Sequence, residues 1–169
     1  MIEKMKGITL PINCSPKEQD EIFMRCALGL AQKAAELNEV PVGAVIVSRG
    51  KIVGQGYNLR EQGRDATLHA EMIAIREACQ TLGGWRLPDS TLYVTLEPCP
   101  MCAGAMVNAR IDRLVFGACD PKAGAAGSVI DIAACKELNH QMQVTSGILA
   151  DEAAALLKQF FAAKRKGQK

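Results

Sequence analysis

Residues 91–117, TLYVTLEPCPMCAGAMVNARIDRLVFG, contain the pattern that decides the fold. The apolar, β-branched run at 91–96 predicts a strand, 99–108 predicts a short helix, and 113–117 predicts a second strand. This strand–helix–strand order favours parallel strands, and a right-handed crossover places the helix over one face of the sheet. The stretch therefore predicts an α/β fold.

The flanking sequence supplies the remaining elements. Apolar residues at three- and four-residue steps predict a helix between Ser15 and Asn38, and Ser15 with Glu18 has the sequence of a capping box. The same reasoning predicts a hairpin from 42–47 and 52–53, helices at 68–82 and 151–166, a strand at 144–148, and a weak helical stretch after the small-residue loop 124–128. We expect one domain at 15–166, a three-layer α/β/α sandwich around a central mixed sheet of about five strands.

Length and composition indicate one ordinary globular domain. The chain has 169 residues, of which 49% are hydrophobic and 22% charged, close to average globular usage. No apolar run approaches the roughly 18–20 residues that a membrane helix needs, so we expect no membrane insertion. The seven cysteines are an odd number, which favours a reducing compartment over a disulfide framework and predicts a cytoplasmic protein.

The two ends of the chain differ in composition from the rest. Residues 1–14 precede the first predicted helix, and we interpret them as an N-terminal extension. The last six residues include four cations, Lys164, Arg165, Lys166 and Lys169, and no acid. This basic end, which closes with a tail at 167–169, favours contact with a polyanion, although a solvated terminus has the same composition.

Two short motifs contain the residues that can carry chemistry. His69 and Glu71 form an H-x-E pattern, and Pro98, Cys99 and Cys102 form a P-C-x-x-C pattern. One imidazole and two thiolates suit tetrahedral zinc, and three protein ligands leave one coordination position open, as catalytic zinc sites do. Each motif begins a predicted helix, so we expect both helix starts to face one pocket. The sequence therefore predicts a catalytic zinc site with these three ligands.

Glu71 complements this ligand set. Zinc lowers the pKa of bound water towards about 7, and a neighbouring carboxylate can accept the released proton and deliver it elsewhere. Taken separately, the motifs have ordinary interpretations: a redox or structural-zinc cysteine pair, a hydrogen-bonded structural histidine and a solvated glutamate. Their conjunction favours a zinc hydrolytic deaminase, because redox chemistry would leave His69 and Glu71 without a role.

At these residues the sequence resembles the cytidine and nucleotide deaminase superfamily, whose zinc motif combines H-x-E with P-C-x-x-C. Within it, the chain from about Phe23 to Arg165 is most similar to the bacterial tRNA-specific adenosine deaminase family. The stretches that carry this narrower resemblance are 39–45, 91–99, 101–106, 124–128, 139–140, 147–149 and 160–161.

This resemblance implies a cytidine deaminase-like fold, one Zn²⁺ per subunit and a homodimer. It also implies hydrolytic deamination of adenosine to inosine at the wobble position of a tRNA anticodon stem-loop. Zinc-activated water would attack C6 of adenine, and Glu71 would move a proton to the ring and then to the departing amino group. The substrate-binding residues that the resemblance implies are Val42, Asn58 and Ala70 at the target base, Asp120, Lys122 and Asn139 along the anticodon-loop groove, and Phe161 and Arg165 on the last helix.

The chain departs from the family pattern at two neighbouring positions. The family usually has Pro and Ala where this chain has Ala66 and Leu68, which predicts a looser loop before His69 and a bulkier pocket rim. Two other functions fit the zinc motifs: a deaminase of free purine or pyrimidine bases or nucleosides, and a noncatalytic RNA-binding module with structural zinc. The groove residues and the basic end favour the tRNA enzyme over the first, and Glu71 favours catalysis over the second.

Overall fold

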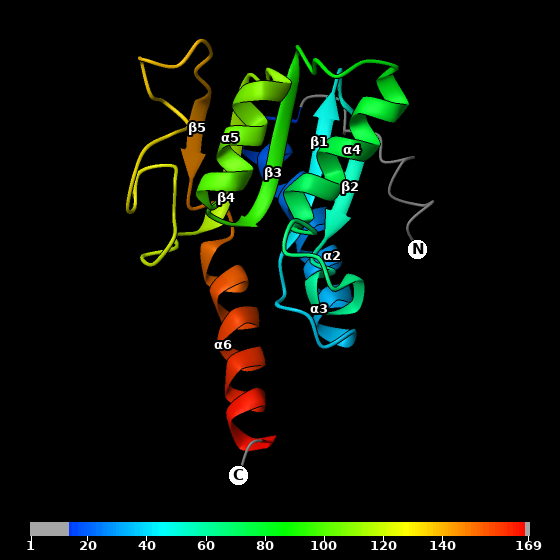
Figure 1. Cartoon of the computed structure of the whole chain (residues 1–169), viewed down its shortest axis with the longest axis vertical. Helices are drawn as coiled ribbons and strands as arrows, with labels where there is room; N and C mark the ends of the chain where they lie inside the picture. The colour runs from blue at the N-terminus through cyan, green and yellow to red at the C-terminus, as the bar shows by residue number, and fades with distance from the viewer. Residues whose placement is uncertain (1–13, 168–169) are drawn as a thin grey trace.

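The computed structural model describes residues 14–167, so most of the predicted extension and tail, residues 1–13 and 168–169, lies outside the described residues. Its centre is a five-stranded sheet in the order β2-β1-β3-β4-β5 (Figure 1). The strands are β1 (Gly43–Ser48), β2 (Lys51–Tyr57), β3 (Ser90–Leu96), β4 (Arg113–Ala118) and β5 (Gln143–Ser146). β1 pairs antiparallel with β2 and β3, whereas the β3–β4 and β4–β5 pairs are parallel. The predicted mixed sheet and its parallel β3–β4 pair are confirmed.

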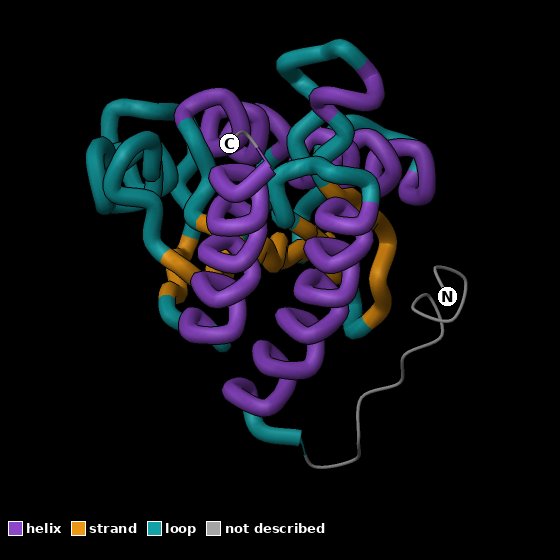
Figure 2. Tube along the Cα trace, turned by 90° about the horizontal axis from the view of Figure 1, so that it is seen from below, coloured by secondary structure: helices purple, strands orange, loops and turns teal. Residues whose placement is uncertain are grey.

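Helices cover both faces of this sheet, which confirms the three-layer sandwich (Figure 2). They are α2 (Pro16–Glu36) and α6 (Ala150–Gly167) on one face, α4 (Ala70–Leu82) and α5 (Pro100–Ala109) on the other, and the short α3 (Arg60–Gly63) in the β2–α4 connection. Among the helices formed by residues 14–167, none is both long enough and apolar enough to cross a lipid bilayer.

Strand side chains alternate between two cores, as the period of a β-strand requires. Ile46, Leu92 and Leu114 pack towards α4 and α5, and all three are fully buried. Their neighbours Val45 and Val115 pack towards α2 and α6. The sheet is therefore buried on both sides, and the α4–α5 side holds the two helix starts that the zinc motifs occupy.

Local sequence signals account for the first helix and the hairpin. The Ser15 hydroxyl accepts a hydrogen bond from the Glu18 backbone N–H, and the Glu18 carboxylate accepts one from the Ser15 N–H, which confirms the capping box. The β1–β2 turn places Arg49 and Gly50 at φ angles of 50° and 72°. Two consecutive positive φ angles match the right-handed twist of the strands that this tight turn joins.

Glycines on β2 determine how closely α4 approaches the sheet. A Cβ added to Gly56 would lie 2.2 Å from the Ala70 carbonyl oxygen, and one added to Gly54 would lie 2.2 Å from that of Ala74. The backbone of α4 therefore rests directly on β2, and the first turn of α4 is held at the end of the strand.

The weak helical stretch predicted after residue 128 is wrong. Residues 119–142 form turns with one isolated bridge, Ala126 to Asp131, and connect two parallel strands without a helix. Ala133 and Met142 from this connection are buried in the α5-side core. Several of its N–H groups bond to a side-chain carboxylate or to carbonyl groups such as that of Ala125, which replaces helical pairing.

Candidate zinc centre

The metal-ligand motifs lie at the starts of two neighbouring helices, as predicted. His69 is the N-cap of α4 and Cys99 is the N-cap of α5, both with extended backbone. Cys102 follows in the first turn of α5, and Glu71 lies in the first turn of α4. Because an N-cap residue is not yet helical, the His69 side chain is free to turn towards the cysteines while Glu71 remains on the helix.

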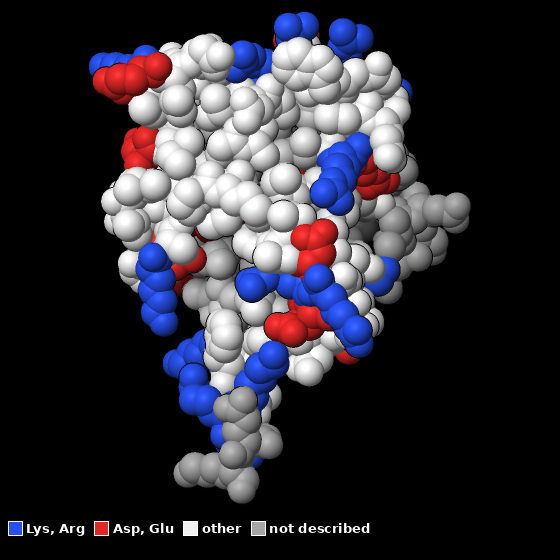
Figure 3. All heavy atoms as spheres, in the orientation of Figure 1, with Lys and Arg blue, Asp and Glu red and all other residues white. Residues whose placement is uncertain are grey.

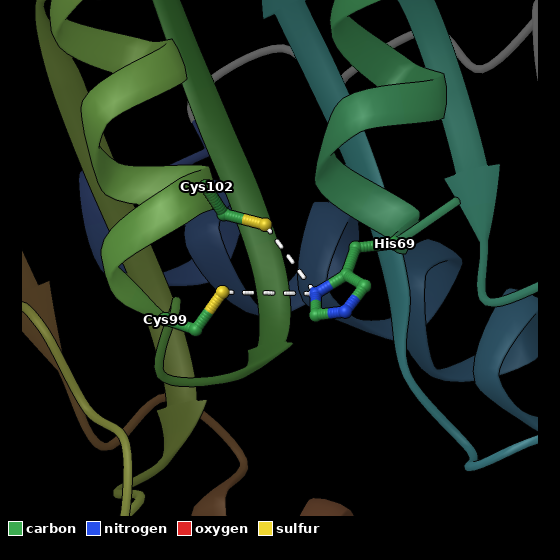
Figure 4. Close-up of side chains that lie close together, drawn as sticks. All are labelled: His69, Cys99 and Cys102. Atoms are coloured by element: carbon green, nitrogen blue, oxygen red, sulfur yellow. Dashed lines mark hydrogen bonds between the residues drawn. The ribbon is translucent and has the colours of Figure 1, made fainter. Parts of the chain in front are cut away.

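The three donor atoms have the spacing that zinc requires. The Sγ atoms of Cys102 and Cys99 lie 3.5 Å and 3.7 Å from Nδ1 of His69 (Figure 4), and all three donors lie within 4.8 Å of one another. Tetrahedral zinc, with Zn–N of about 2.0 Å and Zn–S of about 2.3 Å, places nitrogen and sulfur about 3.5 Å apart. The ligand set therefore fits zinc in both chemistry and size.

Glu71 lies beside these donors in a buried position. Its side chain is 3% exposed, and Oε2 has no hydrogen-bond partner among the described residues. Burial raises the pKa of the Glu71 carboxyl, because the low-dielectric surroundings disfavour the charged form. An unpartnered carboxylate oxygen with a raised pKa suits a group that accepts and releases a proton.

The three ligands also shift one another's protonation. A hydrogen bond from the Cys102 thiol, followed by the contact with His69, lowers the pKa of Cys99 to about 3 despite its burial. The Cys102 pKa is raised because this thiol donates that hydrogen bond and is itself buried. Pairing with Cys99 raises the pKa of His69. Cys99 is therefore the donor that loses its proton most readily in the metal-free chain, and zinc binding must release the proton held by Cys102 and any proton held by His69.

Two predicted base contacts are bonded to each other in this structure. Oδ1 of Asn58 accepts a hydrogen bond of 2.9 Å from the Ala70 backbone N–H, and the Asn58 side chain is buried. Asn58 therefore caps α4 in place of His69, whose side chain makes no cap. The Ala70 N–H, which the resemblance assigns to the base, is satisfied within the chain. Val42 is 5% exposed, and its carbonyl accepts from the Asn58 N–H.

The loop before His69, which the sequence predicts to be looser because Ala66 stands in it, is held by hydrogen bonds of its own. The Asp65 carboxylate accepts hydrogen bonds of 2.7 Å from both the N–H and the hydroxyl of Thr67. The Leu68 side chain occupies the space next to Gly63, where an added Cβ would lie 2.2 Å from Cδ1 of Leu68. The Leu68 side chain is therefore accommodated by a neighbouring glycine within the loop.

The three predicted groove residues occupy different places. Asp120 and Lys122 lie in the connection after β4, where the Asp120 carboxylate accepts the Lys122 N–H at 2.9 Å. Asn139 accepts a hydrogen bond of 2.7 Å from Arg110, which caps the C-terminal end of α5. The ten residues of α5 span about 15 Å, so within one chain Asn139 is not brought to the zinc centre, which lies at the opposite end of this helix.

The last helix presents the remaining two predicted contacts. Phe161 on α6 is 43% exposed, with its ring 5.4 Å from that of Phe160. Arg165 lies in the last turn beside Lys164 and Lys166. Figure 3 shows Lys and Arg side chains gathered over this C-terminal end of α6.

Sequence reasoning missed Glu97, which lies between the zinc motif and the end of β3. This glutamate is 2% exposed and accepts hydrogen bonds from Asp120, Ala126 and Ser128. The available signal was an acidic residue between Leu96 and a proline, directly after a buried strand. A charged residue in such a position is seldom buried without partners.

Comparison with known proteins identifies the class to which this site belongs. Residues 17–118 match the family described as the cytidine and deoxycytidylate deaminase zinc-binding region. The chain therefore belongs to this family of zinc-binding deaminases, as its motifs predicted.

Individual relatives narrow the comparison further. The chain is 50% identical to the tRNA-specific adenosine deaminase of Bacillus subtilis (strain 168) over 151 residues, which cover 89% of this chain and 94% of that protein. A structure solved in studies of A-to-I editing by tRNA:A34 deaminases at the wobble position of transfer RNA is 46% identical, with a TM-score of 0.78 over 80% of this chain and 99% of that one. The guanine deaminase from Nitrosomonas europaea, at 24% identity and a TM-score of 0.73 over 95% of this chain and 91% of that one, shares the fold.

Proposed function

We propose that this protein hydrolyses adenosine to inosine and ammonia at the wobble position of a tRNA anticodon. The observation that carries the proposal is the 50% identity to a tRNA-specific adenosine deaminase across 94% of that relative's length. The chemistry is supported independently by the donor set of His69, Cys99 and Cys102, with the unpartnered Glu71 carboxylate beside it.

The chain's own residues account for the proton movements of this hydrolysis. His69, Cys99 and Cys102 would hold one Zn²⁺ per subunit, and the bound ion would activate a water molecule as the nucleophile at neutral pH. Oε2 of Glu71 would accept one proton of the water and pass it to the adenine ring nitrogen, and would then carry the second proton, from the hydroxyl group added at C6, to the amino group, which leaves as ammonia as the C6–N bond breaks. The raised pKa of Glu71 brings this carboxyl closer to the working pH, as a proton carrier requires.

The groups that would recognise the target base are Asn58 and Val42, which lie beside the start of α4. Asn58 uses its carbonyl oxygen on the Ala70 N–H, which leaves its NH₂ group able to donate to a purine acceptor. Val42 lies beside Asn58 and offers an apolar contact. The target base must leave the stacked anticodon loop to reach these groups, and a loop nucleotide does so at lower cost than a paired one.

The RNA backbone would be held outside this pocket. Lys122 is exposed on the connection after β4, and Lys164, Arg165 and Lys166 form the cationic end of α6 (Figure 3). These cations contact phosphates without reading sequence, so binding should weaken as salt is raised. We keep Asp120, Asn139 and Phe161 as further predicted contacts to the anticodon loop.

We also propose that the protein is a cytoplasmic homodimer. Met72 and Met101 on α4 and α5 are only partly buried against the core, and Val129 and Ile130 in the neighbouring connection are 53% and 46% exposed. A second copy of the chain would cover this apolar surface, which is unusual on a monomer. All seven cysteines are free thiols in the structure, which suits a reducing compartment.

A substrate comparison tests the proposed reaction. Zinc-loaded protein is incubated with a synthetic anticodon hairpin carrying adenosine at the wobble position, with the same hairpin carrying guanosine there, and with free adenosine, and inosine is measured by mass spectrometry after nuclease digestion. We expect inosine from the first substrate alone. Rapid turnover of free adenosine with an inert hairpin would identify a nucleoside deaminase. Hairpin binding without inosine, unchanged by Glu71→Ala, would identify a noncatalytic module.

A further inference from the structure

Glu97 is a buried carboxylate at the end of β3 that receives hydrogen bonds from a distant loop. The side chain is 2% exposed. Its Oε1 accepts the N–H groups of Ala126 at 3.1 Å and Ser128 at 3.0 Å. Its Oε2 accepts the N–H of Asp120 at 3.0 Å and the hydroxyl of Ser128. One side chain therefore binds three separated points of the connection after β4.

The loop is shaped around this carboxylate. A Cβ added to Gly124 would lie 2.4 Å from Cδ of Glu97, so only a glycine lets the loop backbone approach this closely. Next to it, the Ala125 N–H donates to the Pro98 carbonyl at 2.8 Å. Two acceptor oxygens with four donors form a fully satisfied buried group, which is the condition under which a carboxylate can be buried at low cost.

The same side chain lies between two parts of the proposed active site. Two residues after Glu97 the chain reaches the zinc ligand Cys99. The loop on the other side carries Asp120 and Lys122, whose backbone positions depend on the Asp120 N–H bond to Glu97 and on the Lys122 N–H bond to the Asp120 carboxylate. Glu97 thus connects the start of α5 to the loop assigned to RNA contact.

We infer that Glu97 is a positioning residue that holds the loop at 120–128 in the shape in which it binds the RNA substrate. This inference rests on the proposed function. Within residues 14–167, the Glu97 side chain forms its hydrogen bonds with this loop, so we infer that it acts on the substrate through the loop and not at the reacting atoms. Its loss should therefore raise KM for the RNA, leave kcat nearly unchanged, and leave zinc bound.

Three variants test this role. Glu97→Gln replaces one acceptor oxygen by an NH₂ group that cannot accept, and Ser128→Ala removes a single hydroxyl donor. Asp20→Asn is the matched control, because Asp20 is another buried carboxylate, 4% exposed, bonded to Arg113 at 2.7 Å on the α2 side of the sheet. For each protein we would measure kcat, KM and Kd for the anticodon hairpin, zinc content, and amide hydrogen exchange at 120–128.

Glu97→Gln should raise KM and Kd by about tenfold, change kcat less than about twofold, retain zinc and accelerate exchange at Ala126 and Ser128. Ser128→Ala should have a smaller effect in the same direction, and Asp20→Asn should lower the melting temperature without changing KM. Wild-type KM and Kd in Glu97→Gln despite accelerated exchange would overturn the inference, as would loss of zinc, which would mean that Glu97 acts through Cys99. If wild-type protein binds the hairpin but makes no inosine, the proposed reaction fails, and the Kd values alone decide the role of Glu97.

Discussion

Substituting Gly56 by alanine should damage the zinc centre without touching any residue that binds metal. The added Cβ would lie 2.2 Å from the Ala70 carbonyl oxygen, whereas real contacts of this kind are 3.0 Å or longer. It would also lie 2.8 Å from both Ala74 N and Ile73 Cβ. Because backbone atoms of a helix cannot rotate away, the first turn of α4 must move by roughly 1 Å.

That movement has two measurable consequences. Overpacking of this kind costs about 1–3 kcal/mol of stability, which for a domain of this size lowers the melting temperature by several degrees. His69 and Glu71 move with the helix start, and a misplacement of about 1 Å at a reacting centre reduces turnover by about a hundredfold. We expect Gly56→Ala to bind zinc more weakly than wild type and to deaminate the hairpin about a hundred times more slowly.

The assay combines three readouts on the same preparations: the melting temperature, zinc retention against a chromophoric chelator, and the initial rate of inosine formation. Gly84→Ala is the control, because a Cβ at Gly84 would meet nothing within 4 Å. That variant should match wild type in all three readouts. Wild-type zinc affinity and rate in Gly56→Ala would show that the close approach of β2 does not position the α4 start, and would refute this reasoning.

Three further predictions concern the groups around the metal. Glu71→Gln should abolish deamination but retain zinc. Burial raises the Glu71 pKa, so ionisation destabilises the metal-free wild type as pH rises; this variant should therefore melt higher than wild type at pH 8 and equally at pH 4, as calorimetry would show. Asn58→Ala should lose about 1 kcal/mol of stability by uncapping Ala70, whereas Asn58→Asp keeps the acceptor and should recover stability but not activity. Because zinc binding releases the Cys102 proton, zinc affinity in chelator titrations should fall as the pH is lowered. Because the His69 pKa is raised, this fall should steepen at a pH above 6.5, the pKa of an ordinary histidine.

Local sequence signals were sufficient for much of the fold and for the clustering of His69, Cys99 and Cys102. The capping box at Ser15 and the alternation of β-strand residues depend on short-range physics, so they could be predicted from the chain alone. The clustering of these three side chains could be predicted because their donor types and the two helix starts are both visible in the sequence. The glycines of β2 are visible too, but their role is not, because only the structure shows that α4 rests on them.

The connection after β4 shows where such reasoning stops. The helix predicted there is wrong because the backbone N–H groups of this connection bond to Glu97, a residue more than twenty positions earlier in the chain. The strand order could not be predicted from local sequence either, because nothing in the hairpin sequence indicates that β1 lies between β2 and β3. The resemblance predicts that Asn139 and Asp120 line one groove, yet Asn139 lies beside Arg110 at the end of α5 opposite the zinc ligands. Long-range pairing decided each of these cases.

The coordination of zinc tests the central claim most directly. X-ray absorption at the zinc edge of the metal-loaded wild-type protein should show two sulfur neighbours at about 2.3 Å, together with one imidazole nitrogen and one further light atom at about 2.0–2.1 Å. Cys99→Ser and His69→Ala should each remove one of the assigned protein neighbours. A third sulfur or a second histidine in the wild-type spectrum would close the coordination position that the attacking water needs, and would contradict the account.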